Sequence, residues 1–251
     1  MSASALSTRG LSRSFGSLVV ARDIAIDLPM GGRYALIGPN GAGKTTLINL
    51  ITGMLKPNSG QIALAGEDIT ALEPQERVRK GLARTFQINT LFPGLNALEA
   101  VTLAIAERRG IAGQFWRNIA EHRESIEEAY EILRRLRLAD VCYQPTRELP
   151  YGRQRLLEIA LALATKPKVL LLDEPAAGVP QEESGDIFEV VAGLSDKLTL
   201  LFIEHDMHVV FRFASHIIVL VGGAIYTEGS PAEIAADAGV REVYLGKRTH
   251  G

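Results

Sequence analysis

The feature that most constrains the fold is a glycine-rich segment at residues 38–46, which stands between two periodic patterns. A short apolar run at 34–37, typical of a buried strand, precedes it, and apolar residues at helical spacing follow it from Leu47 to Met54. The segment consists of Gly38, Pro39, Asn40, Gly41, Ala42, Gly43, Lys44, Thr45 and Thr46. Its glycines, lysine and threonine have the spacing of a phosphate-binding loop between a strand and a helix. The segment therefore predicts a nucleotide site.

Each residue type in this loop suits the binding of phosphate. Glycines let consecutive backbone N–H groups converge on an anion, and the following helix adds a partial positive charge at its N-terminus. We expect Lys44 to reach the β- and γ-phosphates and the hydroxyl of Thr45 to hold Mg²⁺. The alternative is a glycine-rich turn that binds nothing, but the strand and helix on either side favour the nucleotide site.

The composition is that of an ordinary globular protein. A chain of 251 residues can bury one sizeable core with room for a subdomain. Its net charge of −2 argues against a nucleic-acid partner, which usually requires a basic surface. Cys142 is the only cysteine, so no disulfide framework or cysteine metal cluster is expected. The N-terminus lacks the apolar core of a signal peptide, and no apolar run approaches the roughly 18 residues of a membrane span, so we expect a cytoplasmic chain.

Acidic residues and a histidine directly follow two apolar runs. The continuous apolar run 169–172, typical of a strand buried on both faces, ends in Asp173 and Glu174. The run 198–203 ends in Glu204, His205 and Asp206. Ligands bind at the carboxyl ends of the strands in open α/β sheets, where the phosphate loop also lies. Each cluster alone could be a helix cap or a surface group, but their convergence on one edge favours a functional site.

Three other segments leave alternatives open. Phe15 lies in a break between the apolar runs of an expected strand region, where it could stack on a base or belong to the core. Gln87 follows a strand-like segment and has no local signal beyond that of a polar loop residue. The segment Leu149, Pro150, Tyr151, Gly152, Arg153 and Gln154 precedes an amphipathic helix, whose free N–H groups could receive an anion supplied by another molecule.

Residues 88–148 change to helical periodicity. Apolar residues repeat at Leu98, Val101 and Ile105, and again at Ile126, Tyr130, Leu133 and Leu136. We expect these residues to form buried helix faces and the charged residues between them, such as Glu127 and Glu128, to be solvated. Phe115 and Trp116 lie in a glycine-containing loop, where they are either buried or mark a partner surface.

The order of these motifs along the whole chain resembles that of the ATP-binding subunit of an ABC transporter. The resemblance implies an α/β fold: a P-loop NTPase core with a RecA-like parallel sheet, an N-terminal antiparallel β subdomain and an inserted helical subdomain at about 88–165. Residues 1–251 would form a single ABC ATPase domain. The cofactors it implies are ATP and Mg²⁺.

The resemblance also implies a role for each motif residue. Asp173 would order Mg²⁺ through water, Glu174 would polarise the attacking water, and His205 would contact the γ-phosphate. Gln87 would contact Mg²⁺ and couple to the membrane subunits, and Phe15 would stack on the adenine.

The finer resemblance is to the ATPases of branched-chain amino acid importers. It rests on residues 173–178, 157–160, 204–207 and 240–246, which read DEPAAG, LEIA, EHDM and VREVYLG. Related ATPases of lipopolysaccharide export share the last two segments. An ATPase of that type, or of a urea or amide system, is therefore an alternative.

Two motifs depart from the family pattern. Where the signature normally reads Leu-Ser-Gly-Gly-Gln, this chain has Pro150 at the serine, without hydroxyl or N–H, and Tyr151 at the first glycine. The segment after Glu174, which usually ends in aspartate, reads Gly178-Val179-Pro180-Gln181. The contacts that both motifs make across an ATPase dimer are therefore in question.

The resemblance implies partners and a location as well. A dimer with a second ATPase would hold each ATP between one phosphate loop and the other chain's signature. Because Pro150 would weaken both sites of a homodimer, a sister ATPase is the simpler partner. The alternative is that Gly152, Arg153 and the helix N-terminus suffice, with Pro150 only pre-setting the turn. Transmembrane permease subunits would bind the helical insert, an extracytoplasmic substrate-binding protein would act indirectly, and the chain would lie peripherally at the cytoplasmic face of the membrane. A soluble ABC ATPase acting on nucleic acid or ribosomes is disfavoured by the single cassette and the absence of a basic excess. A purely regulatory nucleotide-binding module would not need Glu174 and His205.

Overall fold

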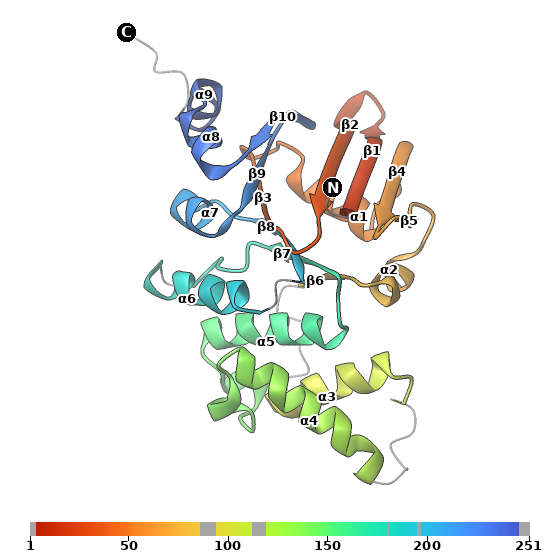
Figure 1. Cartoon of the computed structure of the whole chain (residues 1–251), viewed down its shortest axis with the longest axis vertical. Coiled ribbons are helices and arrows are strands. Elements are labelled where there is room, and N and C mark those ends of the chain that lie inside the picture. Colours follow the sequence, from red (N-terminus) through yellow and green to blue (C-terminus); the bar gives the residue numbers. More distant parts are fainter. Residues whose placement is uncertain (1–3, 86–93, 112–118, 180, 195–196, 246–251) are drawn as a thin grey trace.

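The structure of the protein is a computed structural model that describes residues 4–85, 94–111, 119–179, 181–194 and 197–245. Figure 1 shows a central sheet with an antiparallel sheet beside its upper half and a layer of helices below. Gln87, Phe115 and Trp116 lie outside the described residues. No helix in the described part of the chain is long and apolar enough to cross a membrane.

The central sheet has six strands in the order β10-β9-β3-β8-β7-β6. Five of them are parallel, and β10 pairs antiparallel with β9. Their bounds are Arg33–Ile37 for β3, Leu82–Arg84 for β6, Val169–Asp173 for β7, Thr199–Ile203 for β8, His216–Val221 for β9 and Ala224–Gly229 for β10. The apolar runs 169–172 and 198–203 form the interior strands β7 and β8, whose burial is that expected of a parallel sheet.

The second sheet is antiparallel, with the order β2-β1-β4-β5. Its strands are Ser4–Phe15 for β1, Leu18–Pro29 for β2, Ser59–Leu64 for β4 and Glu67–Asp68 for β5. Ile24, Ile26 and Leu28 are buried in β2 as their alternation predicts, because every second side chain of a strand points to the same face. The pattern of residues 5–37 predicts short strands, but the first two strands are long, 12 residues each.

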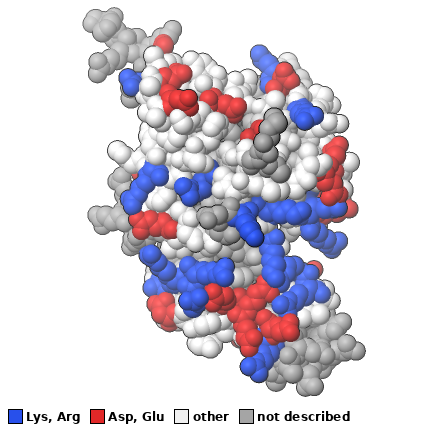
Figure 2. Space-filling model, in the orientation of Figure 1, with Lys and Arg blue, Asp and Glu red and all other residues white. Residues whose placement is uncertain are grey.

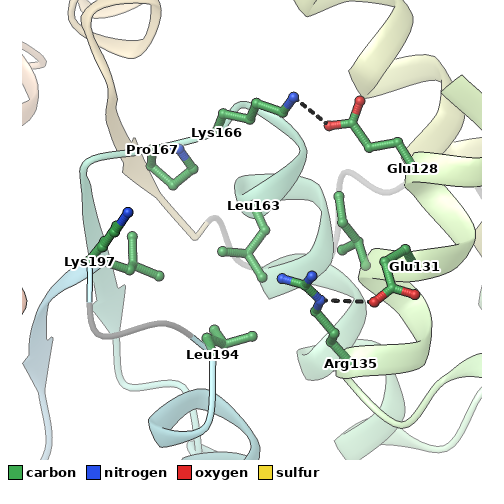
Figure 3. A pocket seen from close by; sticks show the side chains of 10 residues that line it. Glu128, Glu131, Arg135, Leu163, Lys166, Pro167, Leu194 and Lys197 are labelled. Carbon is green, nitrogen blue, oxygen red and sulfur yellow. Dashed lines mark hydrogen bonds and ion pairs between the residues drawn. The ribbon is translucent and has the colours of Figure 1, made fainter. Parts of the chain in front are cut away.

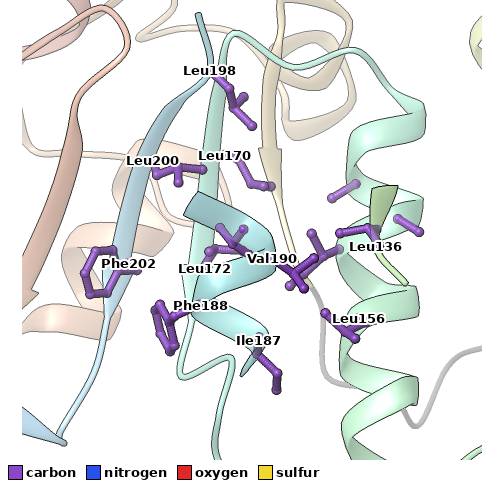
Figure 4. Close-up of a cluster of buried hydrophobic side chains, with 14 of the residues drawn as sticks. Leu136, Leu156, Leu170, Leu172, Ile187, Phe188, Val190, Leu198, Leu200 and Phe202 are labelled. Atoms are coloured by element: carbon purple, nitrogen blue, oxygen red, sulfur yellow. The ribbon is translucent and has the colours of Figure 1, made fainter. Parts of the chain in front are cut away.

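Helices cover both faces of the central sheet and form the lower part of Figure 1. Their bounds are Lys44–Thr52 for α1, Pro74–Lys80 for α2, Ala97–Arg108 for α3, Ile119–Arg135 for α4, Tyr151–Ala164 for α5, Gln181–Ala192 for α6, Met207–Phe213 for α7, Pro231–Ala236 for α8 and Ala238–Leu245 for α9. Short 3₁₀ turns lie at Ala139–Val141 and Thr146–Glu148. One apolar core lies between the central sheet, α1 and the antiparallel sheet. The other packs the opposite face of the sheet against α5, α6 and the helices below, with Phe188 edge-to-face on Phe202 (Figure 4).

The predicted buried face of α4 is wrong in part. Ile126 and Tyr130 are exposed, and the buried stripe runs instead through Ser125, Ala129 and Leu133. These residues are four apart and therefore share one side of the helix. Small side chains at two of the three positions let α4 approach α3 closely. A prediction based on the spacing of large apolar residues does not detect such a face.

The prediction that the charges of α4 are merely solvated is wrong for Glu128. Its carboxylate accepts bonds from both Arg108 on α3 and Arg109, and pairs with Lys166 after α5. The side chain is only 18% exposed, and the bonds from Arg108, followed by Lys166, hold the pKa of Glu128 at about 2. Glu128 therefore joins three helices of the insert. Figure 2 shows the uneven charge of this face, with Lys and Arg gathered in a band across the middle and acidic side chains below it.

Candidate nucleotide site

The phosphate loop connects β3 to α1 in a conformation that requires glycine. Gly43 caps α1 with φ 103°, and a Cβ there would lie 2.7 Å from the backbone oxygen of Val20. A Cβ at Gly38 would lie 2.2 Å from the backbone oxygen of Leu220. Since β2 and β9 approach the loop this closely, larger residues cannot occupy these two positions without displacing a strand.

Lys44 begins α1 and folds back over the loop. Its Nζ donates to the carbonyl oxygens of Gly38, at 2.7 Å, and Pro39, at 3.2 Å. Burial lowers the pKa of Lys44, and the charges of Glu174 and Asp173 oppose this shift in part. A nearly buried ammonium whose partners are neutral carbonyls gains a stronger hydrogen bond if a phosphate oxygen replaces them.

A cavity of about 450 Å³ lies over the loop, within the usual size range of small-molecule sites, roughly 300–1,000 Å³. Its walls combine apolar and polar groups. The lining residues are Leu18, Val19, Val20, residues 40–46, Glu174, Ile203, His205, Gly222 and Gly223. The backbone of the loop and the polar side chains form one part of the wall, and the start of β2 supplies an apolar part. This combination suits a ligand with both an aromatic base and phosphates.

Two parts of this wall were missed from the sequence. Leu18 and Val19 are exposed at the tip of the β1–β2 hairpin, where apolar residues without a packing partner are a signal of a binding surface. From the sequence, Gly222 and Gly223 stand between the apolar segments 217–221 and 224–226 and predict only the turn of a final hairpin. Gly223 also donates its N–H to Ala42 of the loop, 2.9 Å away, and thereby holds the loop against β10.

Phe15 lies at the same hairpin tip, in register with Leu18. Its ring is 50% exposed, with the guanidinium carbon of Arg13 4.7 Å from the ring centroid. Phe15 does not line the cavity, but its partner Leu18 does. The ordinary core position that was considered from the sequence is therefore ruled out.

Glu174 and His205 meet at the carboxyl ends of β7 and β8. The His205 Nε2 lies 2.9 Å from the Glu174 Oε1, and both side chains line the cavity. Glu174 has φ 49°, in the left-handed region that non-glycine residues rarely adopt. Backbone strain of this kind persists only where the surroundings enforce it, and it is concentrated at functional sites.

Glu204 joins the two loops that carry this pair. Its side chain is buried and accepts from the N–H groups of Ala176 and His205, both at 3.2 Å. Burial raises the pKa of Glu204, while these two bonds oppose the shift. Glu204 thus holds the segment after Glu174 and the start of the His205 loop at a fixed separation.

Asp173 ends β7 and pairs with Arg84 at the end of the neighbouring strand β6, with 2.5 Å between Nη2 and Oδ2. The hydroxyl of Thr45 and the carboxylate of Asp173 are oxygen ligands of the kind that Mg²⁺ prefers. In nucleotide sites this ion needs only one or two protein groups besides the phosphates. The donor set of the described residues therefore fits Mg²⁺ bound together with a nucleotide.

The signature segment lies elsewhere: none of its residues lines the cavity. Pro150 caps α5, and Tyr151 begins it. The Tyr151 hydroxyl accepts from the Arg155 Nη2 at 2.9 Å, and a Cβ at Gly178 would lie 3.0 Å from the Tyr151 ring. The structure thus places the start of the signature helix against the segment that follows Glu174.

A separate cavity of about 440 Å³ lies where the chain enters β7 and β8, at the ends of these strands remote from Asp173 and His205 (Figure 3). Leu163, Pro167 and Leu194 form apolar parts of its wall. Two ion pairs lie at its rim. Lys166 pairs with Glu128 at 3.2 Å, and Arg135 pairs with Glu131 of the same helix at 3.1 Å. Of the predicted site residues that the structure describes, none lines it.

The chain belongs to the ABC transporter family, whose model matches residues 21–177. A second model, that of the branched-chain amino acid ATP-binding cassette transporters, matches residues 227–250. The fold class and family resemblance predicted from the sequence are confirmed, and the chain is an ATPase of this family.

Individual relatives match nearly the full chain. It is 36% identical over 256 residues to the high-affinity branched-chain amino acid transport ATP-binding protein BraF of Pseudomonas aeruginosa, covering 98% of this chain and 100% of the relative. It is 35% identical over 254 residues to the corresponding protein LivG of Escherichia coli, with the same coverage. Among solved structures, an ATP-binding cassette of an ABC transporter in its ADP conformation matches with a TM-score of 0.84 at 32% identity, covering 97% of this chain and 99% of that one.

Proposed function

We propose that this chain is the ATPase of an importer for branched-chain or closely related amino acids. The observation that carries the proposal is the match of its C-terminal residues 227–250 to the branched-chain amino acid cassette model. The named functions of the relatives from Pseudomonas aeruginosa and Escherichia coli support it. These comparisons favour the importer over the lipopolysaccharide-export and urea or amide alternatives.

The geometry supports a division of roles within the site. Residues 38–46 bind the phosphates of ATP, and the apolar start of β2 with the exposed Phe15 receives the adenine. Glu174 orients and polarises the attacking water as general base. His205, 2.9 Å from that carboxylate, contacts the γ-phosphate and restrains the base.

Mg²⁺ bound with the nucleotide would neutralise charge on the phosphates. The hydroxyl of Thr45 and, through water, Asp173 would hold it. Gln87 completes this proposed set, although it lies outside the described residues.

The proposed dimer uses the signature of a partner ATPase. Residues 149–154 lie outside the chain's own cavity, which is consistent with their acting on ATP held by another subunit. Pro150 offers that ATP neither a hydroxyl nor an N–H, so two copies of this chain would weaken both sites. A sister ATPase is therefore the proposed partner, and Gly152, Arg153 and the start of α5 contact its nucleotide.

The proposed permease contact lies on the helical insert, at about 88–165 within the single domain. α3 and α4 present an apolar cavity of about 400 Å³ there, formed by Leu95, Leu98, Thr102, Leu103, Ala106 and Ile126, with Glu99 at its wall. The exposed position of Ile126, unexplained by the chain's own core, suits such a contact. Binding to permeases would hold the chain at the cytoplasmic face of the membrane, and a substrate-binding protein would act from the other side.

Uptake of radiolabelled leucine tests the function. Deletion of the gene should abolish high-affinity uptake, the wild-type gene should restore it, and the Glu174→Gln variant should not. Fractionation with and without the permeases tests the location, which should change from membrane to soluble when they are deleted. Undiminished leucine uptake in the deletion strain, with normal ATP binding by the purified chain, would refute amino-acid import while leaving the ATPase assignment intact.

A further inference from the structure

Arg84 makes a bridge that none of the proposed roles explains. It is the last residue of β6, and its side chain is only 18% exposed. One guanidinium nitrogen, Nη2, donates to the Asp173 Oδ2 at 2.5 Å, and the other, Nη1, donates to the Asn49 Oδ1 at 2.9 Å. The planar fork of arginine thus spans two elements, β7 and α1, that no shorter or single-headed side chain could join.

The position of Asn49 shows which side of α1 the bridge holds. Asn49 follows Thr45 by four residues on α1, and residues four apart lie on the same side of a helix, one turn from each other. Arg84 therefore holds, at one end, the side of α1 that carries the Thr45 hydroxyl. At the other end it holds the Asp173 carboxylate. These are the two described side chains that fit Mg²⁺.

An ordinary structural ion pair is the competing explanation. Ion pairs on exposed surfaces contribute little, about 0–1 kcal/mol, and do not fix geometry. The Arg84–Asp173 pair is different because both partners are mostly buried, and because the second bond, to Asn49, prevents the guanidinium from rotating around a single contact.

We propose that Arg84 is a positioning residue for Mg²⁺. It fixes the Asp173 carboxylate at a set distance from α1, so that Mg²⁺ entering with ATP meets oxygen ligands already in place. This inference rests on the proposed ATP site. Groups that orient metal ligands from behind are typically worth about 10–100-fold in metal affinity.

The test measures Mg²⁺ dependence separately from nucleotide binding. ATP is titrated into the purified full-length chain by calorimetry, first in EDTA and then at graded Mg²⁺ concentrations, for the wild type and for Arg84→Met, Arg84→Lys and Asn49→Ala. Mg²⁺ should increase the affinity for ATP, and Arg84→Met should raise the Mg²⁺ concentration that gives half of this increase by about 10–100-fold. The affinity of Arg84→Met for ATP in EDTA should equal that of the wild type. Arg84→Lys keeps the charge but cannot reach both acceptors, so its Mg²⁺ requirement should be close to that of Arg84→Met. Asn49→Ala should give a smaller shift in the same direction.

Two controls separate the possible failures. Arg33→Met removes an arginine of the same sheet whose Nε donates to Phe213, away from Asp173, and should leave the Mg²⁺ dependence unchanged. Asp173→Asn should itself raise the Mg²⁺ requirement, and adding Arg84→Met to it should have no further effect. If Asp173→Asn leaves the requirement unchanged, the proposed Mg²⁺ ligands are wrong, whatever the role of Arg84.

Three outcomes would overturn the proposal while Asp173→Asn behaves as expected. An unchanged Mg²⁺ requirement in Arg84→Met would show that the bridge is dispensable. A lower requirement would show that the guanidinium competes with Mg²⁺ for Asp173. Equal losses of ATP affinity with and without Mg²⁺, accompanied by a lower melting temperature, would assign Arg84 to the fold alone.

Discussion

The left-handed backbone at Glu174 should make this position a source of instability that the chain retains for catalysis. A non-glycine residue in this conformation costs about 1–2 kcal/mol, whereas glycine loses only about 0.5–1 kcal/mol more backbone entropy than alanine on folding. The variant Glu174→Gly should therefore be about 0.5–1 kcal/mol more stable than Glu174→Ala. The lost contact with His205 affects both variants equally and cancels in this comparison. Both should lose hydrolysis, because neither carries the base.

The assay is urea unfolding of the purified chain without nucleotide. Glu189 provides a matched control, because it has the same side chain at the same 42% exposure but lies within α6. In a helix, glycine is less favourable than alanine by about 1 kcal/mol, so the same pair of substitutions should have the opposite sign at Glu189. If Glu174→Gly is no more stable than Glu174→Ala, the strain does not exist, and the positive φ has no energetic role.

Two further predictions concern the loop and the insert. Lys44→Ala should weaken ATP binding by about 1.5–3 kcal/mol for each lost charged hydrogen bond, while Glu174→Gln should slow turnover by about 10²–10⁴-fold and leave binding intact. Equal binding losses by calorimetry would contradict this division. Folding lowers the pKa of Glu128 from 4.5 to about 2, so its ion pairs stabilise the folded chain. This contribution to the free energy of unfolding is fully present above pH 4.5 and is lost as the pH falls through about 2. Glu128→Gln should therefore lower the free energy of unfolding at pH 7 by up to about 3 kcal/mol and hardly at all at pH 2, and a pH-independent effect in urea unfolding would refute the ion-pair account.

Local patterns were sufficient to predict much of this fold. The alternation of Ile24, Ile26 and Leu28 and the continuous apolar run 169–172 identified strands correctly, since burial on one face or on both leaves a different period in the sequence. Gly81 follows a short charged segment that begins at Pro74, which predicts the end of a helix, and it ends α2 with φ 108°. In each case the residues that set the structure are neighbours in the chain.

Prediction failed where the deciding contact is distant. Ile126 and Tyr130 have helical spacing, but the face that α4 buries depends on how closely α3 approaches it. Arg84 has no local signal at all, because its partners Asn49 and Asp173 lie 35 and 89 residues away along the chain. Glu204 was grouped with the site from its position after a strand, but its task of holding two loops depends on a bond to Ala176, 28 residues away.

One departure from the family pattern, Tyr151, contacts the segment that contains the other departure. Tyr151 stands where the signature normally has glycine, and its ring occupies the space beside Gly178, in the segment after Glu174. Arg155 reinforces this contact, because its guanidinium lies 5.1 Å from the Tyr151 ring centroid and Nη2 also donates to the carbonyl of Ala177 at 3.4 Å. Gly178 leaves room for the ring of Tyr151 because it has no side chain of its own. The start of α5, which would face the partner's ATP, is thereby attached to the segment that leads from the chain's own Glu174.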